Sequence, residues 1–192
     1  MRALILASIL SAASFASPAF ATINECPMKI DFTSADDVRA WRAVNDGVMG
    51  GLSSGGPDYE EDAMVFKGVI NTNGGGFSSL RAGARPGALS DATGMRMRVK
   101  TDGRQYKLTL RSDARYRGRS VSFQAPLPVT KPNEWEDITI LFSDLKASVF
   151  GRPVRGAEFN KDEVGEIGII IADGKDGPFE MKIDWMEKFC GR

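Results

Sequence analysis

The most informative stretch of this chain is Trp41-Arg42-Ala43-Val44-Asn45-Asp46-Gly47-Val48-Met49-Gly50-Gly51-Leu52-Ser53. A second glycine-rich stretch, Asn73-Gly74-Gly75-Gly76-Phe77-Ser78-Ser79-Leu80-Arg81, follows it after the apolar segment Phe66-Lys67-Gly68-Val69-Ile70. Glycines this dense, flanked by alternating apolar residues, indicate a backbone that turns tightly and approaches something closely. The two stretches therefore predict tight loops between strands.

Elsewhere the apolar residues mostly recur with a period of two, which is typical of β-strands. Turn signals such as Thr101-Asp102-Gly103 separate the apolar segments. Strands are predicted at residues 64–70, 77–81, 95–100, 106–111, 121–124, 135–142, 167–171 and 179–186. About nine or ten short strands at this spacing predict an all-β fold, an antiparallel β-sandwich of jelly-roll type.

Two local features complete this expected fold. One short N-terminal helix is expected at residues 34–41, because Ser34 can cap it and two aspartates in its first turn favour the helix dipole. A second helical turn is expected at residues 143–145. In the last strand, Trp185 is expected on the same apolar face as Phe179.

The first 21 residues have the pattern of a cleavable signal peptide. Arg2 precedes an apolar run, and Ala19-Phe20-Ala21 is a small-x-small cleavage site. We therefore expect a periplasmic or secreted protein, with residues 22–192 forming a single jelly-roll domain that has no membrane span and is monomeric.

The two cysteines agree with export. Cys26 lies just after the predicted cleavage site and Cys190 lies near the end of the chain. In an oxidising compartment such a pair indicates a disulfide between the termini, and the alternative is two unpaired buried thiols. The disulfide would place the first and last strands side by side.

Composition narrows the possible chemistry. The chain carries 25 basic and 25 acidic residues, so it has no overall charge to attract nucleic acid. It has 0 histidines, which excludes histidine acid–base catalysis and histidine-ligated zinc. Catalysis would need paired carboxylates, and the spacing of Asp31, Asp46 and Asp184 singles out no pair. We expect no catalytic residue, metal or cofactor.

The glycine-rich stretches also carry the candidate binding site. Asn45, Asp46 and Ser53 are expected to form a polar cluster at a loop rim, suited to hydroxyl-rich or peptide-amide ligands. Asn73, Ser79 and Arg81 of the second stretch complete the predicted site. The alternative is that the glycines only permit turns and close strand packing.

Arg81 has two interpretations. It forms a salt bridge with Asp46 that locks the two loops together, or it binds a ligand carboxylate or phosphate. Arg111, at the start of a basic run that ends at Arg119, is a secondary candidate for an anionic partner.

Two further places in the sequence are candidate binding features. Trp135 begins a strand and is a candidate sugar platform. Asp173 and Asp176 have too few neighbouring oxygen donors for a recognisable calcium motif, so a plain Asp-Gly turn is the preferred interpretation.

The residues 41–53, 66–68, 73–81 and 177–185 together resemble the complex I intermediate-associated protein 30 family, the NADH:ubiquinone oxidoreductase assembly-factor-like domains. The resemblance implies a galactose-binding-like jelly roll. It also implies, in mitochondrial members, a chaperone-like role in assembling respiratory complex I. The predicted signal peptide makes this chain an exported, bacterial-type member instead.

The function that we expect is therefore a non-catalytic exported binding module, which recognises a partner protein or an envelope component. One alternative is a lectin-like carbohydrate-binding module. Another is a carboxylate-based glycan hydrolase or lyase.

Overall fold

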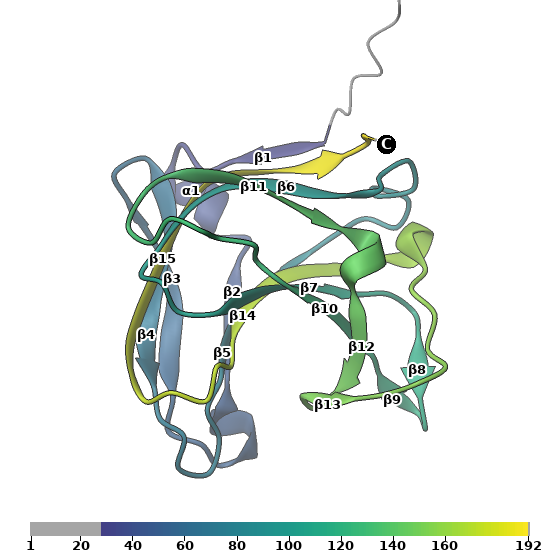
Figure 1. Ribbon diagram of the computed structural model, residues 1–192, viewed down its shortest axis with the longest axis horizontal. Helices are drawn as coiled ribbons and strands as arrows, with labels where there is room; N and C mark the ends of the chain where they lie inside the picture. The colour runs from purple at the N-terminus through teal and green to yellow at the C-terminus, as the bar shows by residue number, and fades with distance from the viewer. Residues whose placement is uncertain (1–27, 192) are drawn as a thin grey trace, which may run out of the picture.

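The computed structural model describes residues 28–191, which form two antiparallel β-sheets packed against each other (Figure 1). The six-stranded sheet has the order β11-β6-β15-β4-β3, with β1 pairing on β15. Its strands are β1 (Lys29–Asp31), β3 (Ser54–Glu60), β4 (Ala63–Ile70), β6 (Gly94–Thr101), β11 (Glu136–Leu141) and β15 (Gly177–Phe189).

The second sheet has seven strands in the order β13-β12-β10-β7-β14-β5-β2. They are β2 (Arg42–Asn45), β5 (Ser78–Gly83), β7 (Tyr106–Arg111), β10 (Ser122–Pro126), β12 (Lys146–Val149), β13 (Arg152–Pro153) and β14 (Glu166–Ile171). Figure 1 shows this sheet curving away from the other, so that β5 and β13 descend on opposite sides of the view. The expected antiparallel β-sandwich is confirmed.

The remaining elements are short. A separate hairpin joins β8 (Arg115–Tyr116) to β9 (Arg119–Ser120), within the predicted basic run. The helical segments are α1 (Ala35–Val38) and the 3-10 turns η1 (Asp46–Met49), η2 (Phe142–Asp144) and η3 (Lys161–Glu163). Fifteen strands are present between residues 28 and 191, more than the nine or ten expected, because several two- to four-residue strands carry no periodic pattern.

Helix α1 is shorter than the sequence indicates. Ser34 occupies the N-cap position as expected, and its N–H donates to Asp37 Oδ2 at 2.9 Å. It ends at Val38 because the chain then turns to bury Trp41, which is 4% exposed. The Trp41 ring meets that of Phe32 edge to face, with 5.8 Å between centroids.

The core between the two sheets is apolar and continuous. Phe66 and Phe179 of the six-stranded sheet meet Tyr106 of the other sheet through edge-to-face ring contacts. The Phe66 and Phe179 centroids are 4.8 Å apart, a separation at which such ring pairs are favourable. One cluster of buried side chains thus draws on both sheets.

A β-bulge in β15 changes which side chains face the core. The pairing of β15 with β6 shifts register between Ile183 and Trp185, so Met186 occupies the core face and is fully buried. The expectation that Trp185 shares the apolar face with Phe179 is therefore wrong. Its ring lies outside the core, 5.6 Å from the guanidinium of Arg96.

The two ends of the described chain lie together. β1 pairs with β15, with Lys29 opposite Glu187, which confirms that the first and last strands are neighbours. Cys26 and the predicted signal peptide lie outside the described residues, so the disulfide to Cys190 and the cleavage site stay predictions. From residue 28 to residue 191, no helix is long and apolar enough to cross a membrane.

Candidate functional site

The Asp46 carboxylate joins the two glycine-rich stretches. Asp46 follows β2 as the first residue of η1 and is 0% exposed. Its Oδ1 accepts a hydrogen bond from the Ser53 N–H at 2.9 Å, and its Oδ2 accepts one from Ser53 Oγ at 2.6 Å. Oδ2 also accepts from the N–H groups of Gly76 at 2.5 Å and Phe77 at 3.3 Å. The carboxylate therefore connects the two loops from inside rather than facing solvent.

The glycines on either side of Asp46 are required by its position. A Cβ on Gly51 would lie 2.3 Å from Asp46 Cγ, and a Cβ on Gly75 would lie 2.3 Å from Asp46 Oδ2. Gly50 ends η1 with a φ of 87°, a left-handed conformation that glycine adopts readily. The glycine pattern thus serves to enclose a carboxylate.

The buried carboxylate keeps its charge. Burial by itself raises the pKa of Asp46, because it removes water from the charged form. The hydrogen bonds from the Ser53 hydroxyl and from the N–H groups of Gly76, Ser53 and Phe77 outweigh burial. As a result, the pKa of Asp46 lies below its ordinary value of 3.8.

The other polar residues of the two loops also form hydrogen bonds within the protein. Asn45 donates from Nδ2 to the Gly55 carbonyl at 3.0 Å and accepts at Oδ1 from Ser78 Oγ at 2.6 Å. Asn73 is exposed, and its N–H donates to Asn71 Oδ1 at 2.9 Å. Asp46 and Ser53 are buried and Asn45 is half-buried, whereas Asn73 lies at the loop surface as predicted.

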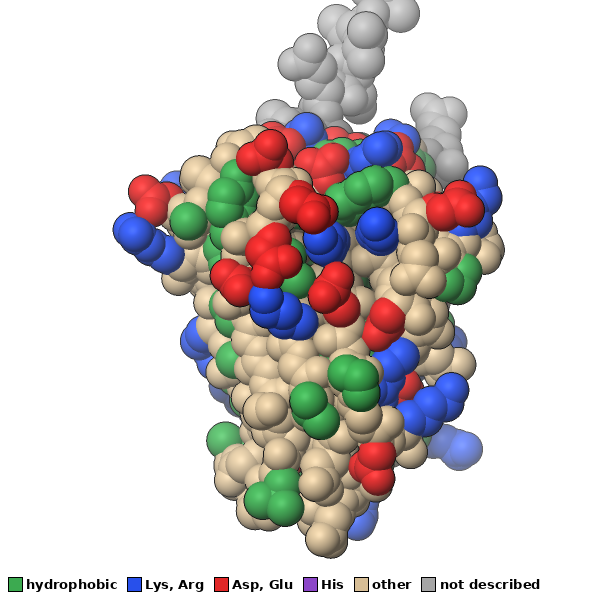
Figure 2. Space-filling model, turned by 90° about the vertical axis from the view of Figure 1, so that its left-hand side faces the viewer, with side chains coloured by type: hydrophobic (Ala, Val, Ile, Leu, Met, Phe, Trp, Pro, Cys, Tyr) green, Lys and Arg blue, Asp and Glu red, His purple; other side chains and the backbone are tan. Residues whose placement is uncertain are grey.

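What the loop presents to solvent is apolar. Val48 is 75% exposed, Met49 is 54% exposed and Leu52 is 67% exposed. We call these three residues the apolar tip. Figure 2 shows hydrophobic side chains and few charges toward the lower end of the molecule, the end at which η1 lies in Figure 1. The sequence already contains a signal for an exposed tip, because these three residues lie in a glycine-rich loop where no strand alternation would bury them.

Ser79 and Arg81 lie on a different surface. They alternate along β5 with Leu80 and Ala82, which face the core, so their side chains point to the opposite face of the seven-stranded sheet. Arg81 Nε donates to Ser79 Oγ at 2.9 Å, and Arg81 Nη1 lies 3.7 Å from Glu166 Oε1. The expected Arg81–Asp46 salt bridge is therefore wrong.

The face of the seven-stranded sheet that points away from the core is polar. The register places Arg81 opposite Gly168, which in turn lies opposite Thr109, and places Glu166 opposite Arg111. Several of these side chains are buried or half-buried although they lie on the outer side of the sheet. We call this surface the polar face; it comprises Arg42, Ser79, Arg81, Thr109, Arg111, Ser122, Gln124 and Glu166.

The secondary candidates fall in separate places. Arg111 ends β7 on the polar face, where its Nε lies 3.3 Å from Glu166 Oε1. Trp135 is 37% exposed, and the guanidinium of Arg98 lies 5.9 Å from its ring centroid. Trp135 thus shows part of a ring to solvent, away from the apolar tip.

The aspartates considered for calcium or for catalysis have protein partners. Asp173 accepts two hydrogen bonds from Arg104, at 3.0 and 2.7 Å, and Asp176 accepts the Thr72 N–H at 2.6 Å. Asp31 is ion-paired with Lys29 at 2.6 Å, and Asp184 with Arg98 at 3.3 Å. Over residues 28–191, no group of three His, Cys, Asp or Glu side chains is arranged to hold a metal ion.

The two packed antiparallel sheets form a β-sandwich. The chain belongs to the complex I intermediate-associated protein 30 (CIA30) family, which matches residues 30–183. A mouse (Mus musculus) relative, complex I intermediate-associated protein 30, mitochondrial, is 30% identical over 96 residues. The match covers 48% of this chain and only 29% of the mouse protein.

Several solved structures that are similar to this chain are carbohydrate-binding modules. The family 11 module of a Clostridium thermocellum cellulase, Lic26A-Cel5E, has a TM-score of 0.63 at 14% identity, covering 84% of this chain and 94% of that one. The same family's module in complex with a β-1,3-1,4-mixed-linked tetrasaccharide has a TM-score of 0.61 at 14% identity, covering 85% and 98%. A family 30 module has a TM-score of 0.55 at 12% identity, covering 86% and 90%. At these identities the likeness establishes the fold alone.

Proposed function

We propose that this chain is a non-catalytic, exported binding module that holds a partner protein through its apolar tip, in the manner of an assembly factor. The observation that carries this proposal is that Val48, Met49 and Leu52 are all more than half exposed within five consecutive positions. Single exposed apolar residues are ordinary, but a cluster of them on one loop is typical of an interaction site.

The base of the loop is built to hold the tip in one conformation. The buried Asp46 carboxylate binds the backbone on both sides of the tip-bearing turn, through the N–H groups of Ser53 and Gly76. A loop that is already ordered loses less conformational entropy when it binds, so the same contacts yield a higher affinity. The hydrogen bonds at the loop base therefore increase the affinity that the apolar tip can provide.

The family supports a role in protein assembly. The mouse relative is a complex I intermediate-associated protein, and the family matches residues 30–183, which contain both glycine-rich stretches. The predicted signal peptide supports the location that we propose, the periplasm or the exterior. There the chain would bind a protein or another envelope component instead of a matrix protein.

The test is an affinity capture from envelope extract with the mature, oxidised chain. A triple variant, Val48→Ser, Met49→Ser and Leu52→Ser, removes the apolar tip. Phe150→Ser is the matched control, because Phe150 is 68% exposed on the turn between β12 and β13. We expect the triple variant to fold and lose the captured partner while the control retains it. Equal recovery by all three proteins would overturn the proposal.

Carbohydrate binding is the second candidate, favoured by the polar face. Hydroxyl groups and guanidinium donors gather there on a sheet whose fold is similar to carbohydrate-binding modules. Saturable binding to neutral glycans in a panel, lost on Thr109→Val but not in the apolar-tip variant, would establish it.

A further inference from the structure

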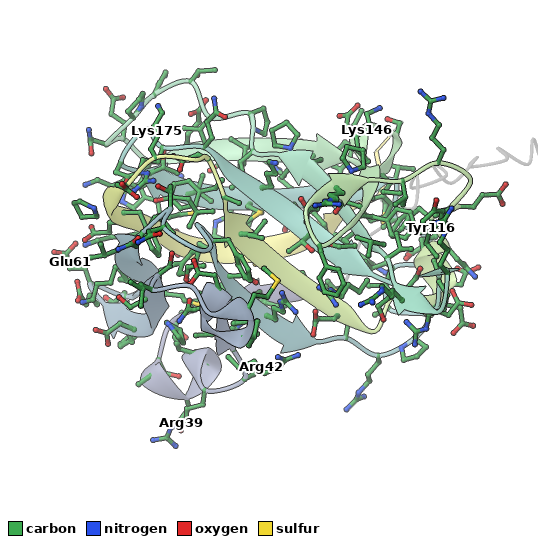
Figure 3. The ribbon with its side chains drawn as sticks, turned by 90° about the horizontal axis from the view of Figure 1, so that it is seen from below. Arg39, Arg42, Glu61, Tyr116, Lys146 and Lys175 are labelled. Carbon is green, nitrogen blue, oxygen red and sulfur yellow. The ribbon has the colours of Figure 1, made fainter. Side chains whose placement is uncertain are left out.

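Three arginines surround one glutamate on the polar face. Arg42 Nη2 lies 2.5 Å from Glu166 Oε2, while Arg111 Nε and Arg81 Nη1 lie 3.3 and 3.7 Å from Glu166 Oε1. They come from β2, β7 and β5, on either side of β14, which carries Glu166. In the view from below, Arg42 lies at the β2 edge of this sheet (Figure 3). The cluster therefore holds two positive charges in excess.

The half-buried Arg81 side chain leaves most of its guanidinium donors without a hydrogen-bond acceptor among the described residues. Its side chain is 14% exposed, yet its one hydrogen bond within the described chain runs from Nε to Ser79 Oγ. The 3.7 Å separation from Glu166 is too long for a hydrogen bond. A guanidinium has five N–H donors, and neither terminal nitrogen of Arg81 is among the buried donors without a partner, so both reach solvent. The terminal nitrogens of Arg81 are thus available to a ligand.

Arg111 shows the same deficit. Its Nε is buried and donates no hydrogen bond in suitable geometry, although Glu166 Oε1 lies 3.3 Å away. Unsatisfied buried donors are rare in native proteins and require an explanation. Burial lowers the pKa of Arg81, and the nearby Arg111 and Arg42 charges lower it further, against the opposing effect of Glu166. One carboxylate therefore does not balance this cluster.

We propose that Arg42, Arg81 and Arg111 bind the oxyanion of an acidic, hydroxyl-rich ligand, either a carboxylated or a phosphorylated sugar. Guanidinium groups pair with carboxylate and phosphate oxygens through two parallel hydrogen bonds, which the free nitrogens of Arg81 can supply. The hydroxyls of Thr109 and Ser122, 2.8 Å apart on the same face, lie beside the cluster for the ligand's hydroxyls.

Glu166 has a defined part in this site. It holds the three guanidinium groups together in the absence of ligand, and it competes with the ligand's anion for them. The inference rests on the carbohydrate-binding candidate for the polar face and is independent of the apolar tip. Beyond that candidate function, the inference specifies that the sugar ligand carries an acidic group.

The test uses three sugars that differ mainly at C6: glucuronic acid, glucose 6-phosphate and glucose. Binding to the mature, oxidised chain is followed by NMR at the arginine Nε–Hε resonances, which report on Arg81 and Arg111 directly. We expect saturable shifts of these resonances with one or both acids, at concentrations up to tens of millimolar, and none with glucose. The acid that saturates at the lower concentration identifies the carboxylate or the phosphate as the preferred group.

Variants separate the site from general charge attraction. Arg81→Gln should weaken acid binding about tenfold, through loss of one bidentate pair. Arg39→Gln is the control, because Arg39 directly follows α1 and points away from the sheet (Figure 3). Glu166→Gln should tighten acid binding about threefold, since it removes the competing charge.

Several results would overturn the inference. Shifts that are equal for glucose and the acids would do so while leaving neutral carbohydrate binding in place. Acid binding that Arg39→Gln and Arg81→Gln weaken equally would also overturn the inference. Absence of any shift in the unmodified protein would refute it even if a variant failed to fold.

Discussion

Replacing Asp46 by Asn tests the claim that this carboxylate holds the two glycine-rich loops together. The change keeps the size of the side chain and removes its charge. Oδ2 accepts three hydrogen bonds, from Ser53 Oγ and from the N–H groups of Gly76 and Phe77, and Oδ1 accepts one, from the Ser53 N–H. The amide oxygen of Asn fits best at the Oδ2 position, so its NH2 group then opposes the Ser53 N–H.

The cost follows from that geometry. Asp46→Asn loses one charge-assisted hydrogen bond, leaves two donors facing each other and weakens the remaining three bonds. We expect the free energy of unfolding to fall by about 2–3 kcal/mol. Asp46→Ala removes all the acceptors and leaves a small cavity, and should lower it by about 4 kcal/mol.

Urea-induced unfolding of the oxidised protein, followed by tryptophan fluorescence and circular dichroism, measures both values. Asp113→Asn is the control, because Asp113 is exposed, and it should change stability by less than about 0.5 kcal/mol. If Asp46→Asn were as stable as the unmodified protein, the carboxylate would not hold the loops and our account of the glycine pattern would be refuted.

Three further predictions concern stability. Gly51→Ala should cost about 2–3 kcal/mol in urea unfolding, because its Cβ would lie 2.3 Å from Asp46 Cγ, whereas Gly83→Ala, with no atom within 4 Å, should be neutral. Asp173→Asn should lower the free energy of unfolding by about 3 kcal/mol, because it leaves the charge of Arg104, 12% exposed, without its carboxylate; an unchanged urea midpoint would contradict this. The pKa of Asp46 lies below 3.8 in the folded protein, so its stabilisation is present above about pH 4 and is lost as the pH falls through the lowered pKa. Melting temperatures from pH 2.5 to 6 should therefore fall less steeply with acid in Asp46→Asn, and parallel curves would contradict the assignment.

The long strands could be predicted because each buries one face and keeps the two-residue period. β4, β7 and β14 lie within about one residue of their predicted positions. The sequence pattern does not predict β3, Ser54–Glu60, since this strand contains two glycines and Pro57. It is an edge strand that pairs only with β4 in its sheet, and an edge tolerates proline.

The candidate site was predicted only in part. The sequence indicated that Asn45, Asp46 and Ser53 act together, and the structure brings Asp46 and Ser53 into contact. It did not indicate that Asp46 is buried, because a run of Asp and Gly is also typical of an exposed turn. Asp46 is buried because the second glycine-rich loop, which contains Gly76, covers it. That loop lies far from Asp46 along the chain.

Three properties were determined by the sequence alone: the alternating strands, the tight glycine-rich loops and the family to which the chain belongs. These depend on local backbone preference and on the order of residues. Only the tertiary structure decided that Arg81 faces Glu166 and that the apolar tip stands free of the core. The physical reason is register: the pairing of β14 with β5 and β7 sets which side chains are neighbours. That pairing joins segments far apart in sequence, and no local pattern encodes it.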